Sequence, residues 1–148
     1  LGCAIYRSSA VISVKPLNDS IYWNLFLSGV SESLVKNANA RNEELKNTII
    51  AALEDLKAVD ITVISVADSS SVTDWMVIAT GTSNRHVKAL ASNVEVDGKK
   101  YGFKTIGSEG NETAEWVLVD FGGVIVHVML PTTRAFYDLE SLWTLKPA

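Results

Sequence analysis

The sequence is poor in cysteine, histidine and proline, and it has no excess of basic residues. It contains 1 cysteine, 2 histidines and 3 prolines in 148 residues. The single cysteine, Cys3, excludes an intramolecular disulfide and a cysteine-based zinc cluster. Lys and Arg number 13 against 17 Asp and Glu, which gives a formal net charge of −4. Such a chain is a poor candidate for binding nucleic acid through the phosphates, which requires a basic patch or stripe.

Long apolar runs and the common catalytic motifs are also missing. The longest apolar stretch of residues 1–42, residues 21–27, is far shorter than the roughly 20 residues that a membrane-spanning helix needs. The sequence contains no HExxH zinc motif, no Gly-x-Ser-x-Gly turn and no P-loop. We therefore expect no catalytic residue, metal, cofactor or membrane partner. Hydrophobic residues at 47% and charged residues at 20% are typical of an ordinary soluble globular domain.

Charge is distributed unevenly along the chain. Residues 1–42 carry a net charge of +2, whereas residues 43–148 carry −6. The sequence therefore predicts an acidic domain at 43–148 that follows an N-terminal extension at 1–42. The serine-rich extension is open to three interpretations: a leader foreign to the domain, a targeting segment, or an element that packs on the domain or on a second subunit. The acidity of the domain has two interpretations: it keeps an ordinary domain soluble, which charge alone favours, or it suits a basic protein partner.

Hydrophobic periodicity predicts an α/β fold from residue 43 onward. We expect helices from an Asn42 N-cap to about Lys57 and from residue 84 to a stop or break at Asp97-Gly98, with a last helix that Thr132 or Thr133 caps. The apolar positions of the last helix are Phe136, Leu139, Leu142 and Trp143. We expect strands at 61–66, 75–80, 103–106, 115–121 and 124–130. This order predicts a mixed sheet of about five strands that is packed with helices.

The Gly122-Gly123 turn defines the two faces of a hairpin, because directly opposite residues share a face. One face is predicted core and contains Val117, Val119, Phe121, Val124, Val126 and Val128. The other face contains Trp116, Leu118, Asp120, Ile125, His127 and Met129. A helix covers this second face or a partner meets it, and covering by a helix is the favoured alternative. We interpret His127 as a structural histidine that Asp120 can reach with a hydrogen bond.

One segment suggests an alternative function. Gly81-Thr82-Ser83 lies between a predicted strand and a predicted helix, where backbone N–H groups bind anions. Glu95 and Asp97 downstream have the spacing of a nucleotidyltransferase carboxylate pair. They fall within a helical pattern, in which residues two apart point in different directions. A nucleotide-binding or nucleotidyltransferase-like enzyme is thus the alternative hypothesis.

Six segments of the domain carry short motifs in a defined order. They lie at residues 57–61, 71–87, 107–110, 115–122, 126–128 and 136–143. In this order and spacing they resemble the ribosomal silencing factor family, also called the Iojap family. The chain departs from the family pattern at Gly123, where Asp is usual, at Trp75, and at 96–98, which interrupts a normally longer helix.

The resemblance implies an α/β domain with a nucleotidyltransferase-like topology that lacks the catalytic carboxylates and is not an enzyme. It implies a cytoplasmic protein that binds the large ribosomal subunit through the ribosomal protein numbered fourteen. The bound protein blocks joining of the small subunit and so represses translation. A homodimer in the free state is implied as well, whereas direct sequence-specific binding of nucleic acid is not.

Five partner-binding residues follow from the resemblance by position: Trp116, Leu118, Asp120, Pro131 and Tyr137. Trp116 is expected to be the aromatic anchor, since aromatic side chains often dominate interfaces. Asp120 is expected to pair with a cation of the partner. Gly123 in place of the usual Asp removes one acidic contact.

Overall fold

The computed structural model describes the backbone of residues 20–144 and the side chains of residue 34 and residues 36–143. The chain divides into two units, Leu1–Ala38 and Asn39–Ala148. The described part of the first unit is helical and belongs to α1 (Ser20–Asp55). No helix within the described residues is both long and apolar enough to cross a membrane.

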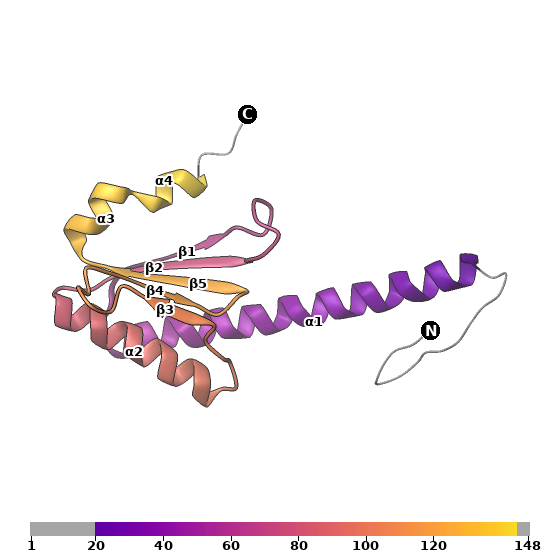
Figure 1. Cartoon of the computed structure of the whole chain (residues 1–148), viewed down its shortest axis with the longest axis horizontal. Helices are drawn as coiled ribbons and strands as arrows, with labels where there is room; N and C mark the ends of the chain where they lie inside the picture. The colour runs from indigo at the N-terminus through magenta and orange to yellow at the C-terminus, as the bar shows by residue number, and fades with distance from the viewer. Residues whose placement is uncertain (1–19, 145–148) are drawn as a thin grey trace. The chain divides into compact units, whose positions relative to one another are not determined.

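The second unit contains a mixed sheet of five strands, which confirms the predicted α/β class (Figure 1). The strands are β1 (Val59–Ser65), β2 (Trp75–Thr80), β3 (Gly107–Glu109), β4 (Trp116–Asp120) and β5 (Val124–Met129). Their spatial order is β1-β2-β5-β4-β3, and only the central pair β2–β5 is parallel. The helices after α1 are α2 (Asn84–Lys100), α3 (Pro131–Tyr137) and α4 (Leu139–Thr144).

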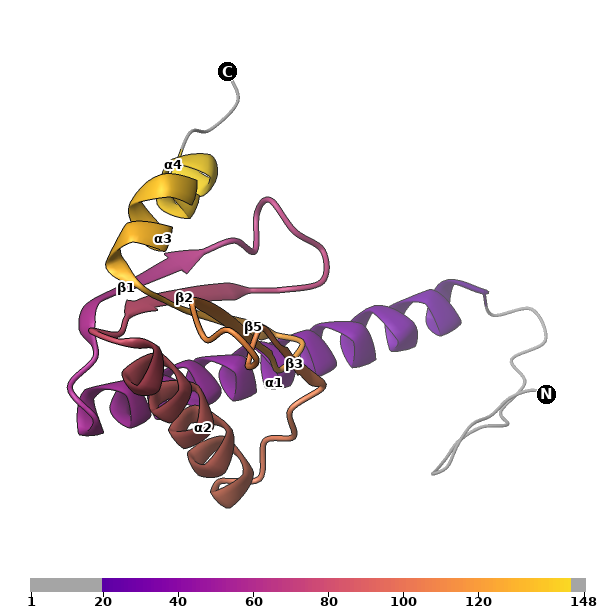
Figure 2. The same cartoon turned by 60° about the vertical axis from the view of Figure 1, so that its left-hand side comes forward.

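The helices lie on both faces of the sheet (Figures 1 and 2). The part of α1 from Asn39 onward and α2 cover one face, and α3 with α4 cover the other. The hairpin register is confirmed, because Trp116 pairs with Met129 and Leu118 pairs with His127. The predicted core row faces α1 and α2, and all of its valines are fully buried. Each buried valine contributes roughly 1.5–3 kcal/mol of hydrophobic free energy.

The second face of the sheet is covered, as predicted, but only in part. A smaller apolar cluster of Val66, Met76, Ile78 and Met129 lies there, and Leu139 and Trp143 of α4 pack against it. On β4, by contrast, the side chains of this face are only half-buried. The helices therefore cover β2 and the end of β5 and leave β4 partly open.

Arg134 attaches α3 to the sheet. Its guanidinium donates to Thr62 Oγ1 at 2.9 Å, to Thr80 Oγ1 at 2.8 Å and to the Asp60 carbonyl. It also forms an ion pair with Glu140 Oε2 at 3.3 Å. These contacts join β1, β2, α3 and α4 through one side chain. They fix the position of the short α3, whose seven residues alone bury little apolar surface.

Two predicted helix ends are wrong. The helix expected to begin after Asn42 begins at Ser20, and Asn42 lies within it. Instead of capping the helix, the Asn42 side chain donates to Asp74 Oδ2 at 2.6 Å. The helix α2 continues through Gly98 to Lys100. Gly98 has a packing role, because a Cβ atom there would lie 2.8 Å from the Phe121 ring.

The strand predicted at 103–106 and the single last helix are also wrong. The edge strand is β3, Gly107–Glu109, and Phe103 instead packs into the core. The C-terminal helical segment begins with Pro131 as its first residue after Leu130, so neither predicted threonine caps it. Asp138 then adopts a left-handed conformation (φ 44°) and divides the segment into α3 and α4.

The loop before β4 requires a glycine at position 110. Gly110 has φ +90°, and a Cβ atom there would lie 2.0 Å from the Trp116 carbonyl oxygen. Gly102 has nearly the same φ, +87°, but a Cβ atom there would meet nothing within 4 Å. An alanine at either position would have a strained backbone, but only an alanine at position 110 would also overlap a neighbouring atom.

We predict that Gly110→Ala lowers the free energy of unfolding more than Gly102→Ala does. The Gly102→Ala change costs about 1 kcal/mol, because only the left-handed conformation is penalised. The Gly110→Ala change costs at least about 2 kcal/mol more, because the methyl group displaces the Trp116 backbone. Urea unfolding of both variants measures the difference, and equal values would contradict the close approach.

Candidate functional site

Three aromatic side chains form a partly exposed patch where β4 meets α3. The rings of Trp116 and Tyr137 lie 4.8 Å apart between centroids, and those of Tyr137 and Phe136 lie 5.0 Å apart. Trp116 is half-buried, whereas Tyr137 is 51% and Phe136 is 81% exposed. We call Trp116, Phe136 and Tyr137 the aromatic patch.

A buried histidine holds the Trp116 ring in place. Trp116 Nε1 donates to His127 Nδ1 at 3.0 Å, so the neutral ring of His127 carries its proton on Nε2. His127 is only 6% exposed, and this burial lowers its pKa to about 4. The interpretation of His127 as a hydrogen-bonded structural residue is confirmed. The predicted bond with Asp120 is wrong, because Asp120 Oδ1 accepts from Gly122 N at 2.8 Å.

The other predicted site residues lie around the aromatic patch. Leu118 and Asp120 follow Trp116 along the same face of β4, and both are half-buried. Tyr137 contacts the Trp116 ring directly. Pro131 is exposed at the opposite end of α3, about 9 Å from Tyr137 along the helix axis. The structure therefore brings Trp116 and Tyr137 together and places Pro131 at the margin.

Sequence reasoning missed the exposure of Phe136 and Leu142. Both were predicted to be apolar positions of one packed helix, yet Leu142 is 66% exposed. The break at Asp138 changes the direction of the chain, so that of the four apolar positions predicted for this helix, Leu139 and Trp143 are the two that pack against the sheet. The spacing of Leu139 and Trp143 could have indicated this, because residues four apart lie on the same side of a helix and these two alone can form its apolar side.

Acidic side chains share the β4 face on which Trp116 lies. Glu109 pairs with Leu118 across the β3–β4 ladder and so lies on the same face as Leu118. Asp120 lies on β4 itself. The nearby cation on α3, Arg134, is already bound to Glu140. The patch therefore combines exposed aromatic surface with a negative surrounding, which suits a basic partner that presents an apolar group.

The family model described as "Ribosomal silencing factor during starvation" matches residues 39–148. The chain belongs to the ribosomal silencing factor family. Ribosomal silencing factor RsfS of Chromobacterium violaceum is 50% identical over 101 residues, which are 68% of this chain and 83% of that protein.

Two further matches extend the family assignment. A mouse protein named "Mitochondrial assembly of ribosomal large subunit protein 1" is 38% identical over 101 residues, 66% of this chain and 44% of that protein. A crystal structure of a protein from Chromobacterium violaceum has a TM-score of 0.68 at 50% identity and covers 72% of this chain and 89% of that chain. The described sheet and helices are therefore the fold of this silencing factor family.

The Gly81-Thr82-Ser83 turn of this silencing factor domain is closed by its own residues. Ser83 caps α2 by accepting from the His86 backbone N–H at 3.1 Å, and Thr82 N donates to His86 Nδ1 at 2.9 Å. A Cβ atom on Gly81 would lie 2.6 Å from Val87 Cγ2. These contacts use the Thr82 and His86 N–H groups within the turn itself, and the turn has the geometry of an ordinary helix cap.

The carboxylates Glu95 and Asp97 both lie on α2 and not on a strand. Residues two apart on a helix do not face each other, so the pair cannot hold one metal ion in common. Among the described residues, no group of three or more His, Cys, Asp or Glu side chains is arranged to hold a metal ion. The family description likewise names a silencing factor and no enzyme class.

We predict that His127 makes the unfolding free energy depend on pH. Its pKa is about 4 in the folded protein and 6.5 when unperturbed, so the unfolded chain binds the proton first as the pH falls. The stabilisation is complete above pH 6.5 and decreases toward pH 4 by up to roughly 3 kcal/mol. Urea unfolding between these pH values measures the decrease.

The matched variant for this prediction is His127→Asn. The amide oxygen of Asn still accepts a hydrogen bond, but the side chain does not titrate in this range. The difference in unfolding free energy between wild type and variant should therefore change with pH. A constant difference would show that His127 does not cause the dependence.

Proposed function

We propose that this protein binds the large ribosomal subunit and represses translation by blocking the joining of the small subunit. The observation that carries the proposal is the exposed aromatic patch with acidic neighbours. The family description supports action on the ribosome, and the name of the mouse relative points to the large subunit. Such a protein acts in the cytoplasm, where the subunits join.

The aromatic patch has the properties of a binding hot spot. Trp116 is held by His127 on one side and by Tyr137 on the other, so its rotamer is already fixed before a partner arrives. Preorganisation lowers the entropy that binding costs. Phe136 is free to enter a pocket of the partner, and the half-buried Leu118 extends the apolar contact along β4.

The charge of the site indicates which component of the subunit is bound. Acidic neighbours repel the phosphates of bare RNA but attract a basic ribosomal protein, and the resemblance names the protein numbered fourteen. Asp120 uses Oδ1 to accept from Gly122 N, and Oδ2 can accept from a partner lysine or arginine. The bound domain would then repress translation by steric exclusion, because it would occupy the surface on which the small subunit docks.

We predict that Trp116→Ala weakens binding to the large subunit by at least about 2 kcal/mol, or about thirtyfold in Kd. The variant loses the ring that the patch is built around. Co-sedimentation with large subunits at low and moderate salt measures the affinity. Wild-type protein that stays in the supernatant at both salt concentrations would overturn the proposed function.

Trp75→Ala is the matched control for this experiment. Trp75 is also half-buried, but it packs on the α1 side of the sheet, where Lys46 Nζ lies 4.2 Å from its ring centroid. Its loss tests the effect of removing an indole ring away from the patch. If both folded variants lose affinity equally, Trp116 is not part of the interface.

We also propose that the free protein forms a homodimer through the same patch. Phe136 and Leu142 are 81% and 66% exposed, and a second copy could cover them. Dimerisation and ribosome binding then compete by mass action. Sedimentation velocity over a dilution series should show a dimer that Phe136→Asp converts to monomer, and a wild-type monomer at every concentration would contradict this.

A further inference from the structure

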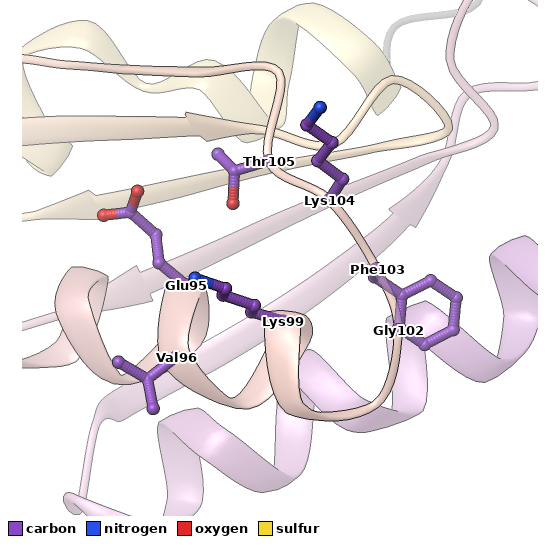
Figure 3. Close-up of a pocket in the computed structure, with 7 residues that line it drawn as sticks. All are labelled: Glu95, Val96, Lys99, Gly102, Phe103, Lys104 and Thr105. Carbon is purple, nitrogen blue, oxygen red and sulfur yellow. The ribbon is translucent and has the colours of Figure 1, made fainter.

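A second surface feature lies on α2 and the loop that follows it. An open groove of about 580 Å³ is lined by Glu95, Val96, Lys99, Gly102, Phe103, Lys104 and Thr105 (Figure 3). We call this feature the basic groove. The last turn of α2 supplies Lys99, and the loop supplies Lys104 (Figure 3).

Three cations lie at the basic groove of an otherwise acidic domain. Lys99 and Lys104 line it, and Arg41 lies with its guanidinium 4.8 Å from the ring centroid of the lining residue Phe103. Arg41 also donates to the Gly102 carbonyl at 2.9 Å. Within the described residues, none of the three forms an ion pair with a carboxylate. Their positive charge is therefore available to a partner.

The basic groove is connected to the β4 residues of the candidate site through the edge strand of the sheet. The loop that contains Lys104 leads directly into β3, and Ile106 N donates to the Asp120 carbonyl at 2.7 Å. Thus β3 separates the groove from the β4 residues of the candidate site. Since α2 and the aromatic patch lie on opposite faces of the sheet (Figures 1 and 2), a partner reaches both only around the β3 edge.

We propose that the basic groove binds the phosphodiester backbone of ribosomal RNA beside the protein partner. This inference rests on the proposed function, which brings the domain to a surface made of both RNA and basic protein. The net charge of −4 argues against bare RNA as the main partner but not against a local contact. Local phosphate contacts add affinity without sequence specificity.

The lysines of the groove can bind phosphate oxygens. Their ammonium groups act as point charges and donate hydrogen bonds to phosphate oxygens at many angles. The arginine at this site, Arg41, already uses its guanidinium on the Gly102 carbonyl and the Phe103 ring. Glu95 is the acidic member of the groove, so it opposes a phosphate and limits the affinity.

The test measures how salt affects binding of the full chain to large subunits. Neutralising two lysines with Lys99→Gln and Lys104→Gln should reduce the slope of log affinity against log salt by about 2. Affinity at low salt should fall at least about tenfold. The control removes two cations from the other end of the same helix with Arg85→Gln and Lys88→Gln, which are exposed and distant from the groove. This control should leave the slope unchanged.

Two further measurements make the inference falsifiable. Glu95→Gln should strengthen binding, because it removes the carboxylate that repels a phosphate. A photo-crosslinker on Val96→Cys, in a chain with Cys3→Ser, should label ribosomal RNA, and labelling of protein alone would overturn the inference. If wild type binds and the groove variants match the control, the groove proposal fails while the proposed function stands. If wild type does not bind at all, the proposed function itself fails.

Discussion

The central strands β2 and β5 are buried on both faces, and the rest of the domain depends on this constraint. A strand that is buried on both faces needs a layer of helices on each side of the sheet. On one side, α1 and α2 supply long apolar surfaces. On the other side, the helices within residues 20–144 are α3 and α4, with seven and six residues. This pair covers β2 and the end of β5 but cannot also cover β4.

The incomplete cover explains why the candidate site lies where it does. The side chains of β4 on that face remain half-buried, and Trp116 is held by the Tyr137 ring and by its hydrogen bond to His127. Burying the polar imidazole ring of His127 in an apolar layer is unfavourable unless the ring is hydrogen-bonded. The indole N–H of Trp116 offsets this cost by donating a hydrogen bond to His127. The same contact that satisfies the core therefore orients the exposed ring.

Much of this arrangement could be predicted from local sequence. The Gly122-Gly123 turn was enough to assign the hairpin register and both of its faces, because a tight turn fixes the cross-strand pairs. The family motifs pointed to Trp116 and Tyr137, which the structure shows in contact. Periodicity alone also placed β2 correctly, since its residues are apolar on both faces.

The errors arose where distant contacts override local preference. Gly98 signals a helix end, but the Phe121 ring needs its small size and α2 continues through it. Asn42 resembles an N-cap, but its amide binds Asp74 from the middle of α1. Phe136 matched a helical core position because the left-handed Asp138, which breaks the helix, is not evident from composition. In the first two cases, a residue far away in the sequence determines the local structure. In the third case, a single backbone angle determines it.

The contact of Asn42 with the hairpin region has an evolutionary consequence. A Cβ atom on Gly123 would lie 2.2 Å from Asn42 Oδ1, so the Asn42 amide occupies the space where any side chain at position 123 would begin. A family member with a side chain at this turn position has to vacate that space. Positions 42 and 123 are therefore expected to change together across the family. A substitution at one of the two positions is thus coupled to a substitution at the other, although they are 81 positions apart in the sequence.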